Sequence, residues 1–181
     1  QTPLFGVSLS SLMARQREML AEAAAQEQQH EVPLFLERIL QHLRATALDE
    51  EGLFRVSGST ERVVELRHRL ESGAAIDFDQ EDPHALAAVV KMFLRELPEL
   101  LVPPELNGSI ISSLRTSGST GVVLGDQAEA EEVLAAVRMC LDDLPPDNTA
   151  LLKCLALFLR DVVAHAAVNK MDQNNLFIVF I

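Results

Sequence analysis

One segment of the sequence, residues 82–97, repeats its apolar side chains at the spacing of an α-helix. At about 100° per residue, these side chains fall in a single stripe. The stripe consists of Leu86, Val89, Val90, Phe93 and Leu97. Asp82 can cap the first turn, Pro83 fits within that turn and Pro98 prevents continuation, so we predict one helix between them. Such a helix needs other elements on which to bury its stripe.

The same helical spacing recurs along most of the chain. We predict further helices over residues 9–29, 33–45, 59–70, 104–114, 127–143 and 147–166. Ser59 can cap the third of these helices and Gly73 can end it, while Asp147 or Asn148 can cap the last. Loops are expected at residues 48–57 and 116–125. Asp172 starts a final apolar segment, residues 176–181, which we expect in the core.

Together these segments predict an all-α fold, a single packed bundle of about seven to nine helices. A chain of 181 residues can bury a sizeable core. Ala and Leu dominate while Trp and Tyr are absent, which favours helices over sheets. We therefore interpret residues 1–181 as one domain. The first residues do not resemble a signal peptide, so we expect a piece excised from a longer protein.

The charge balance argues against several classes of partner. The chain has 15 basic and 27 acidic residues, a net charge of −12, whereas nucleic acids and anionic membranes bind to basic stripes or patches. It has no run of about 18 apolar residues that could cross a membrane. Cys140 and Cys154 fit no CxxC pattern and the five histidines form no HExxH pair. We therefore expect no metal site and a cytoplasmic location.

An arginine stands in a short segment bracketed by two glycines, Gly52 and Gly58. Glycines at both ends indicate a bent backbone with unusual dihedral angles. Arg55 lies between Phe54 and Val56, which could anchor the segment while the guanidinium points outward. The alternative is an ordinary surface arginine paired with a nearby glutamate, namely Glu50, Glu51 or Glu61.

Two basic residues, Lys91 and Arg95, lie on the predicted helix 82–97 opposite its apolar stripe. Their spacing of four residues makes them neighbours, and like charges in that arrangement repel. They are either solvated or locally paired residues, or a small positive patch that receives an acidic partner surface. Asn175 would lie in the first turn of the last helical segment. Its amide could bind a partner, cap the helix or face solvent.

Taken in order, six stretches of the chain resemble the Rho GTPase-activating protein (RhoGAP) domain. The opening Phe5-Gly-Val-Ser-Leu is similar to the start of that family, and the other stretches look like its conserved blocks. These are residues 32–36, 48–58, 84–98, 144–159 and 169–180. The resemblance covers nearly the whole chain, and the ordered set is far more specific than any one stretch.

The resemblance implies an all-helical domain that binds the GTP-bound form of a Rho- or Rac-type GTPase and speeds hydrolysis. On the matching positions, Arg55 would be the arginine finger, while Lys91 and Arg95 would support its loop and meet the GTPase. Asn175 would contact the partner's switch region or order the catalytic loop. GTP and Mg²⁺ would belong to the partner, so this chain would be no enzyme itself and would need no cofactor or metal. We expect a monomer, with any membrane recruitment left to other domains of the parent protein.

A second hypothesis is a RhoGAP-like module that binds a GTPase, or another protein, without activating it. Two departures from the family pattern leave room for it. Phe177 stands where the family usually has a small residue, and the chain ends at Ile181, before the family's usual closing helices. On that ground we also expect a domain truncated at its C-terminus.

Overall fold

The computed structural model describes residues 3–22, 30–102, 135, 138, 139 and 141–180. These residues form seven α-helices and one short 3-10 helix, with no strand among them. The elements are α1 (Leu9–Glu22), α2 (Leu34–Thr46), α3 (Thr60–Ser72), η1 (Phe78–Gln80), α4 (Pro83–Arg95), α7 (Pro146–Ala164), α8 (Ala166–Asn169) and α9 (Gln173–Phe180). The predicted all-α fold is thereby confirmed.

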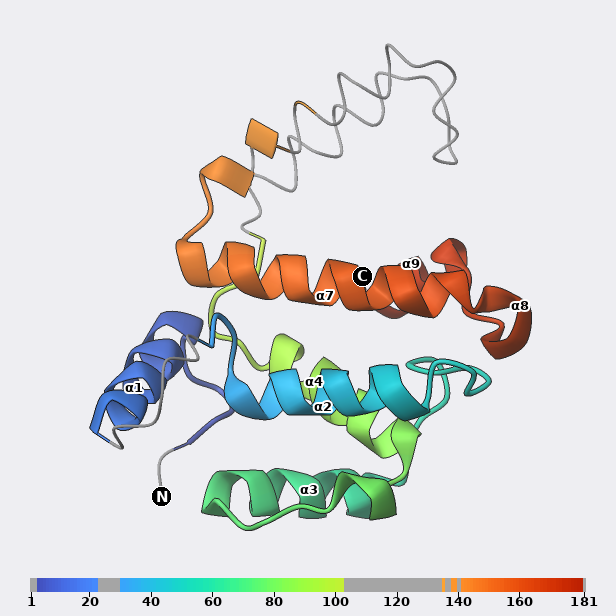
Figure 1. The fold of residues 1–181 in the computed structure, drawn as a ribbon, viewed down its shortest axis with the longest axis horizontal. Helices are drawn as coiled ribbons and strands as arrows, with labels where there is room; N and C mark the ends of the chain where they lie inside the picture. The colour runs from blue at the N-terminus through green and yellow to red at the C-terminus, as the bar shows by residue number, and fades with distance from the viewer. Residues whose placement is uncertain (1–2, 23–29, 103–134, 136–137, 140, 181) are drawn as a thin grey trace.

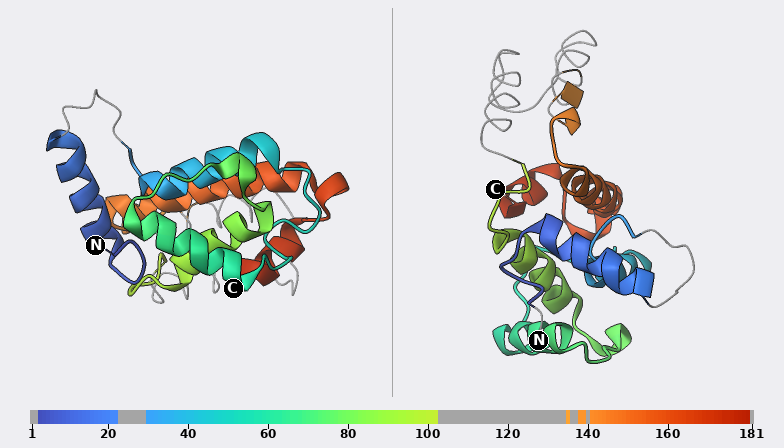
Figure 2. Two further views of the ribbon diagram at one scale, coloured as in Figure 1. Left: turned by 90° about the horizontal axis from the view of Figure 1, so that it is seen from below. Right: turned by 90° about the vertical axis from the view of Figure 1, so that its left-hand side faces the viewer.

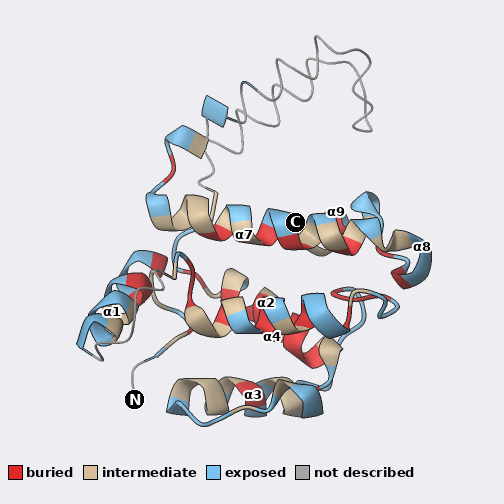
Figure 3. Cartoon of the chain, in the orientation of Figure 1, coloured by how far each residue is buried: buried red, intermediate tan, exposed pale blue. Residues whose placement is uncertain are grey.

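The helices are stacked in layers, with α7 on one side, α3 on the other and α2 and α4 between them (Figures 1 and 2). Helix α4 packs against both α2 and α3, and α7 packs against α1 and α2. Buried residues line the facing sides of these helices (Figure 3). Near α1, the rings of Phe5, Phe35 and Phe93 meet with centroids 5.3–6.0 Å apart.

Helix α4 is the most deeply buried element of the bundle. All five members of the predicted apolar stripe are buried, which confirms the stripe. Ala85, Ala87 and Met92 are buried as well, outside the stripe. The helix is therefore enclosed on more of its circumference than one stripe requires, because α2, α3 and the segment after α2 surround it.

Three of the predicted helix boundaries are confirmed in detail. The Ser59 hydroxyl accepts a hydrogen bond from the Arg62 amide at the start of α3, and Gly73 ends that helix in the left-handed conformation with φ of 71°. Asp82 accepts hydrogen bonds from the amides of His84 and Ala85 at the start of α4. These side chains satisfy amides that a helix end leaves without a partner.

The predicted cap of α7 is wrong. Neither candidate caps the helix, because Pro145 occupies the N-cap position and offers no side-chain hydrogen bond. Asp147 instead forms an ion pair with Arg17 of α1. The Asn148 amide donates to the carbonyl of Leu101, 3.0 Å away. Both side chains therefore bind residues distant in sequence instead of the amides at the start of α7.

The prediction that the apolar tail belongs to the core is only partly right. Leu176 is buried, but Phe177 and Ile178 are 67% and 76% exposed. A helix as short as α9 presents one face to the core, and these two residues lie on the other. The predicted helix 104–114 and loop 116–125 lie outside the described residues, as do residues 23–29, Cys140 and most of the predicted helix 127–143.

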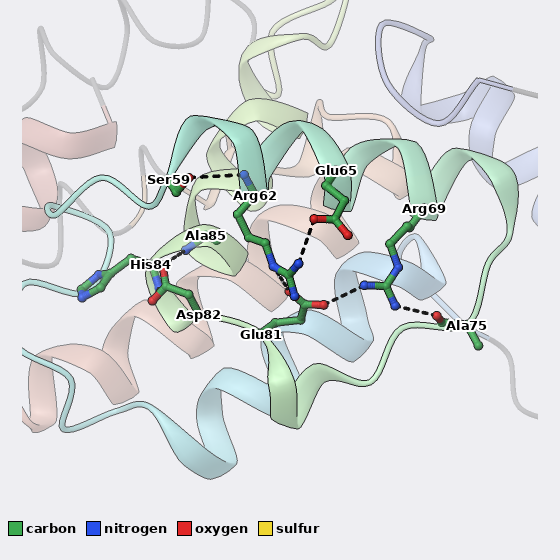
Figure 4. A network of polar contacts seen from close by, with 9 residues as sticks. All are labelled: Ser59, Arg62, Glu65, Arg69, Ala75, Glu81, Asp82, His84 and Ala85. Atoms are coloured by element: carbon green, nitrogen blue, oxygen red, sulfur yellow. Dashed lines mark hydrogen bonds and ion pairs between the residues drawn. The ribbon is translucent and has the colours of Figure 1, made fainter.

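A buried carboxylate joins α3 to the start of α4 (Figure 4). The Glu81 side chain, 1% exposed, accepts hydrogen bonds from Arg62 at 2.8 Å and from Arg69 at 2.9 Å. Arg69 also donates to the carbonyl of Ala75. Because both carboxylate oxygens are occupied, the cost of burying this charge is offset by two charge-assisted hydrogen bonds.

We expect Glu81→Ala to lower the free energy of unfolding by roughly 2–3 kcal/mol, because the guanidinium groups of Arg62 and Arg69 would lose the carboxylate that accepts their hydrogen bonds. Urea denaturation monitored by circular dichroism measures the loss. Glu65→Ala is the matched control, since Glu65 pairs with the same Arg62 but is half exposed. An equal loss in the two variants would contradict the role assigned to Glu81.

Candidate functional site

The segment that carries Arg55 folds into a tight turn, as predicted, but of its two glycines only Gly52 has the unusual dihedral angle expected of both. We call residues 48–58 the Arg55 loop. Gly52 has φ of +72°, and its carbonyl accepts hydrogen bonds from the amides of Arg55 and Val56, both at 2.8 Å. A side chain at Gly52 would also place its Cβ 2.7 Å from the Val56 side chain. Glycine is thus required there both by the dihedral angle and by the close approach.

Phe54 anchors the Arg55 loop in the core. It adopts φ of +69°, a conformation that disfavours a residue with a side chain. Complete burial of the ring offsets the cost of this backbone conformation. The ring centroid lies 5.8 Å from that of Phe158 in α7 and 5.3 Å from that of Phe180 in α9. The second anchor is the buried Leu53. Val56, which we predicted as an anchor, is 44% exposed, so that prediction is wrong.

Arg55, next to the buried ring, points out of the core. Its side chain is exposed and lies along its own loop, where a Cβ on Gly52 would be 3.6 Å from Nη2. Among the described residues, no ion pair links it to Glu50, Glu51 or Glu61. The alternative of an ordinary paired surface arginine is therefore not what this part of the chain adopts.

Lys91 ties the Arg55 loop to α4. Its Nζ donates a hydrogen bond to the carbonyl of Phe54 at 2.5 Å, across 37 positions of sequence. Burial lowers the pKa of the Lys91 amine below its ordinary value, and the neighbouring charge of Arg95 lowers it further. Arg95 itself is exposed. The predicted basic pair thus consists of one lysine that supports the loop and one arginine open to solvent.

Asn175 lies in the first turn of α9, as predicted, and is half-buried. Its side-chain Nδ2 donates to the carbonyl of Lys170 at 2.8 Å, while its backbone amide donates to the carboxylate of Asp172. The amide nitrogen therefore holds the turn that precedes α9. Phe180, at the far end of the same helix, touches Phe54, so α9 lies against the Arg55 loop.

Two histidines also hold the start of the Arg55 loop. His165, which follows α7, contacts Asp49 at 2.7 Å, and His84 of α4 contacts Glu50 at 3.3 Å. Asn169 at the end of α8 is fully buried, and its backbone carbonyl accepts a hydrogen bond from the Gly52 amide at 2.7 Å. We did not single out Asn169 from the sequence. The available signal was a lone carboxamide after the apolar run Ala166-Ala-Val168.

Taken together, these contacts define an all-helical domain that presents exposed Arg55 on a loop bonded to several helices. Helix α4 supports the loop from one direction and the segment from α8 to α9 from another (Figure 1). Within the described ranges, no group of three or more His, Cys, Asp or Glu residues could hold a metal ion. In the same ranges, no helix has the length and apolar character needed to cross a bilayer.

Comparison with known proteins places the chain in a family. The model of the RhoGAP domain matches residues 33–181, so the chain belongs to the RhoGAP domain family. Rho GTPase-activating protein gacY of Dictyostelium discoideum is 34% identical over 98% of this chain and 22% of its own length. Human Rho GTPase-activating protein 1 is 34% identical over 97% of this chain and 35% of its own length.

A solved structure agrees with this assignment. The crystal structure of human Rho GTPase activating protein 15 superposes with a TM-score of 0.80 at 26% identity, covering 98% of this chain and 75% of that one. The chain spans about a fifth to a third of the length of the two relatives named above. The predicted family resemblance is confirmed.

The end of the Arg55 loop is fitted tightly to α4 at Gly58. A Cβ there would lie 2.5 Å from the backbone nitrogen of Ala85. We expect Gly58→Ala to push the loop off α4 and to speed hydrogen exchange of the Arg55 and Val56 amides, measured by NMR. Gly73→Ala is the control. Its Cβ would meet nothing within 4 Å, so any loss should come from its φ of 71° alone and leave the loop amides protected.

Proposed function

We propose that this domain accelerates GTP hydrolysis by a Rho-family small GTPase, binding its GTP-bound form and inserting Arg55 beside the nucleotide. The observation that carries the proposal is the exposed Arg55 side chain, which follows directly after a buried, backbone-strained Phe54. A side chain held this way is available to a partner, and its loop need not be reorganised on binding.

The chemistry of arginine suits this task. During GTP hydrolysis, negative charge shifts toward the bridging and leaving oxygens in the transition state. A guanidinium is always protonated and planar, so it can donate to two of these oxygens at once. Supplied by a partner protein, such a group accelerates hydrolysis by roughly 10³–10⁵-fold. GTP, Mg²⁺ and the attacking water would be held by the GTPase, so the domain would act without a cofactor, as a monomer in the cytoplasm.

The other predicted site residues take supporting roles in this proposal. The hydrogen bond from Lys91 to Phe54 favours a role in holding the Arg55 loop. Exposed Arg95 would meet acidic groups of the GTPase. Asn175 was expected to contact the partner's switch region or to order the catalytic loop. Its bond to the Lys170 carbonyl favours the second role.

No observation favours the second hypothesis, a module that binds without activating. Phe177, which left room for it, is 67% exposed. The hydrogen bond from Asn175 to Lys170 is intact beside it. We therefore keep activation as the proposed function.

We expect Arg55→Ala to abolish most of the stimulated hydrolysis, a fall of roughly 10³-fold or more, while the affinity for the GTP-bound GTPase changes little. Arg55→Lys should recover little of the rate, because lysine keeps the charge but loses the planar fork. Single-turnover hydrolysis and a binding titration measure the two quantities. Arg38→Ala, which removes an exposed arginine stacked on Phe78, is the control. Full stimulation of hydrolysis by the Arg55→Ala variant would contradict the proposal.

We expect Arg95→Ala to weaken binding to the GTPase and to flatten the dependence of affinity on ionic strength, because it removes an exposed charge beside Lys91. Titrations at two salt concentrations test this. Lys153→Ala removes an exposed lysine on α7 and should leave both quantities unchanged. If the two variants behave alike, Arg95 does not face the partner.

A further inference from the structure

Asn169 is a buried polar residue with an unusually complete set of partners. Its side chain is fully inaccessible to solvent. The amide nitrogen donates to the carbonyls of Leu48 at 2.7 Å and Val162 at 2.8 Å, and the amide oxygen accepts from the Met171 amide at 2.7 Å. Both amide protons are therefore used, which is the condition for burying a carboxamide without a large penalty.

These bonds join three parts of the chain at the Arg55 loop. Leu48 begins the loop, Val162 lies in the last turn of α7, and Met171 leads into α9. The backbone carbonyl of Asn169 adds a fourth bond, from the Gly52 amide at the turn of the loop. One residue thus holds the loop at its beginning and at its turn, whereas Lys91 holds it at Phe54.

The bond to Gly52 lies next to the groups that set the direction of Arg55. The Gly52 amide donates to Asn169, and the Gly52 carbonyl accepts from the Arg55 amide. Asn169 is followed by Lys170, which has φ of +60°. The Lys170 carbonyl accepts a hydrogen bond from the side chain of Asn175. The turn at residues 169 and 170 therefore connects the loop of Arg55 to the first turn of α9.

From this geometry we infer that Asn169 is a positioning residue for Arg55. It does not touch the GTPase, but it fixes the backbone from which the guanidinium extends. The inference rests on the proposed function for its catalytic consequence. A side chain displaced by about 1 Å from a transition state can cost on the order of 10²-fold in rate.

Asn169→Asp tests the inference in the 181-residue chain with a purified Rho-family GTPase loaded with GTP. Aspartate has the same shape but lacks the two amide protons, so the bonds to Leu48 and Val162 are lost. At saturating domain, we expect the single-turnover rate to fall by about ten- to a hundredfold, with the half-saturating concentration unchanged within about twofold. In an Arg55→Ala background, Asn169→Asp should cause no further loss. Asn148→Asp is the control, because the half-buried side-chain amide of Asn148 on α7 donates a hydrogen bond to the Leu101 carbonyl, away from the Arg55 loop. This variant should retain the wild-type rate.

A purely structural role would give different results. In a folded variant it would raise the half-saturating concentration or reduce the rate equally in both backgrounds, and either result would overturn the inference. If Asn169→Asp does not fold at the assay temperature, Asn169→Ser takes its place.

Hydrogen exchange gives a readout that does not depend on activation. Exchange of the Gly52, Arg55 and Val56 amides should speed up in either Asn169 variant while amides of α3 stay protected. Unchanged loop protection would refute the positioning role. Failure of the proposed function itself would show separately, as no stimulation by the wild-type domain.

Discussion

The candidate site depends on one local constraint, the burial of Phe54 in a backbone conformation that its side chain disfavours. The ring is locked between Phe158 and Phe180, and its neighbour Arg55 must then leave the core. A residue with φ of +69° persists only where the surrounding structure over-determines it. Here the packing of the ring and the bond from Lys91 to the Phe54 carbonyl act on the same residue.

Several elements hold the Arg55 loop in place through contacts distant in sequence. Helix α4 contributes Lys91, and its first turn lies against Gly58. The end of α8 contributes Asn169, and α9 contributes Phe180. Because these contacts form within the domain itself, an inserted guanidinium would extend from a backbone already held in place.

Electrostatics set the second constraint on the site. The chain carries a net charge of −12, yet Lys91 lies against the Arg55 loop and beside Arg95, and no ion pair among the described residues joins Arg55, Lys91 or Arg95 to a carboxylate. The lowered pKa of Lys91 reflects its burial and the charge of Arg95 beside it. A small basic area on an acidic protein favours a partner with an acidic surface and disfavours nucleic acid.

Local sequence was enough to determine the all-α class, the stripe of α4, the caps Ser59, Gly73 and Asp82, and the outward direction of Arg55. Each of these depends on neighbours within a few positions, where helical spacing and capping chemistry decide. The tertiary structure alone decided that Val56 is exposed, that Asp147 pairs with Arg17 instead of capping α7, and that Lys91 binds the Phe54 carbonyl. It also decided that Asn169 holds a loop 121 positions away. Such partners are brought together only when the helices pack, so their contacts cannot be predicted from the spacing of residues along the chain.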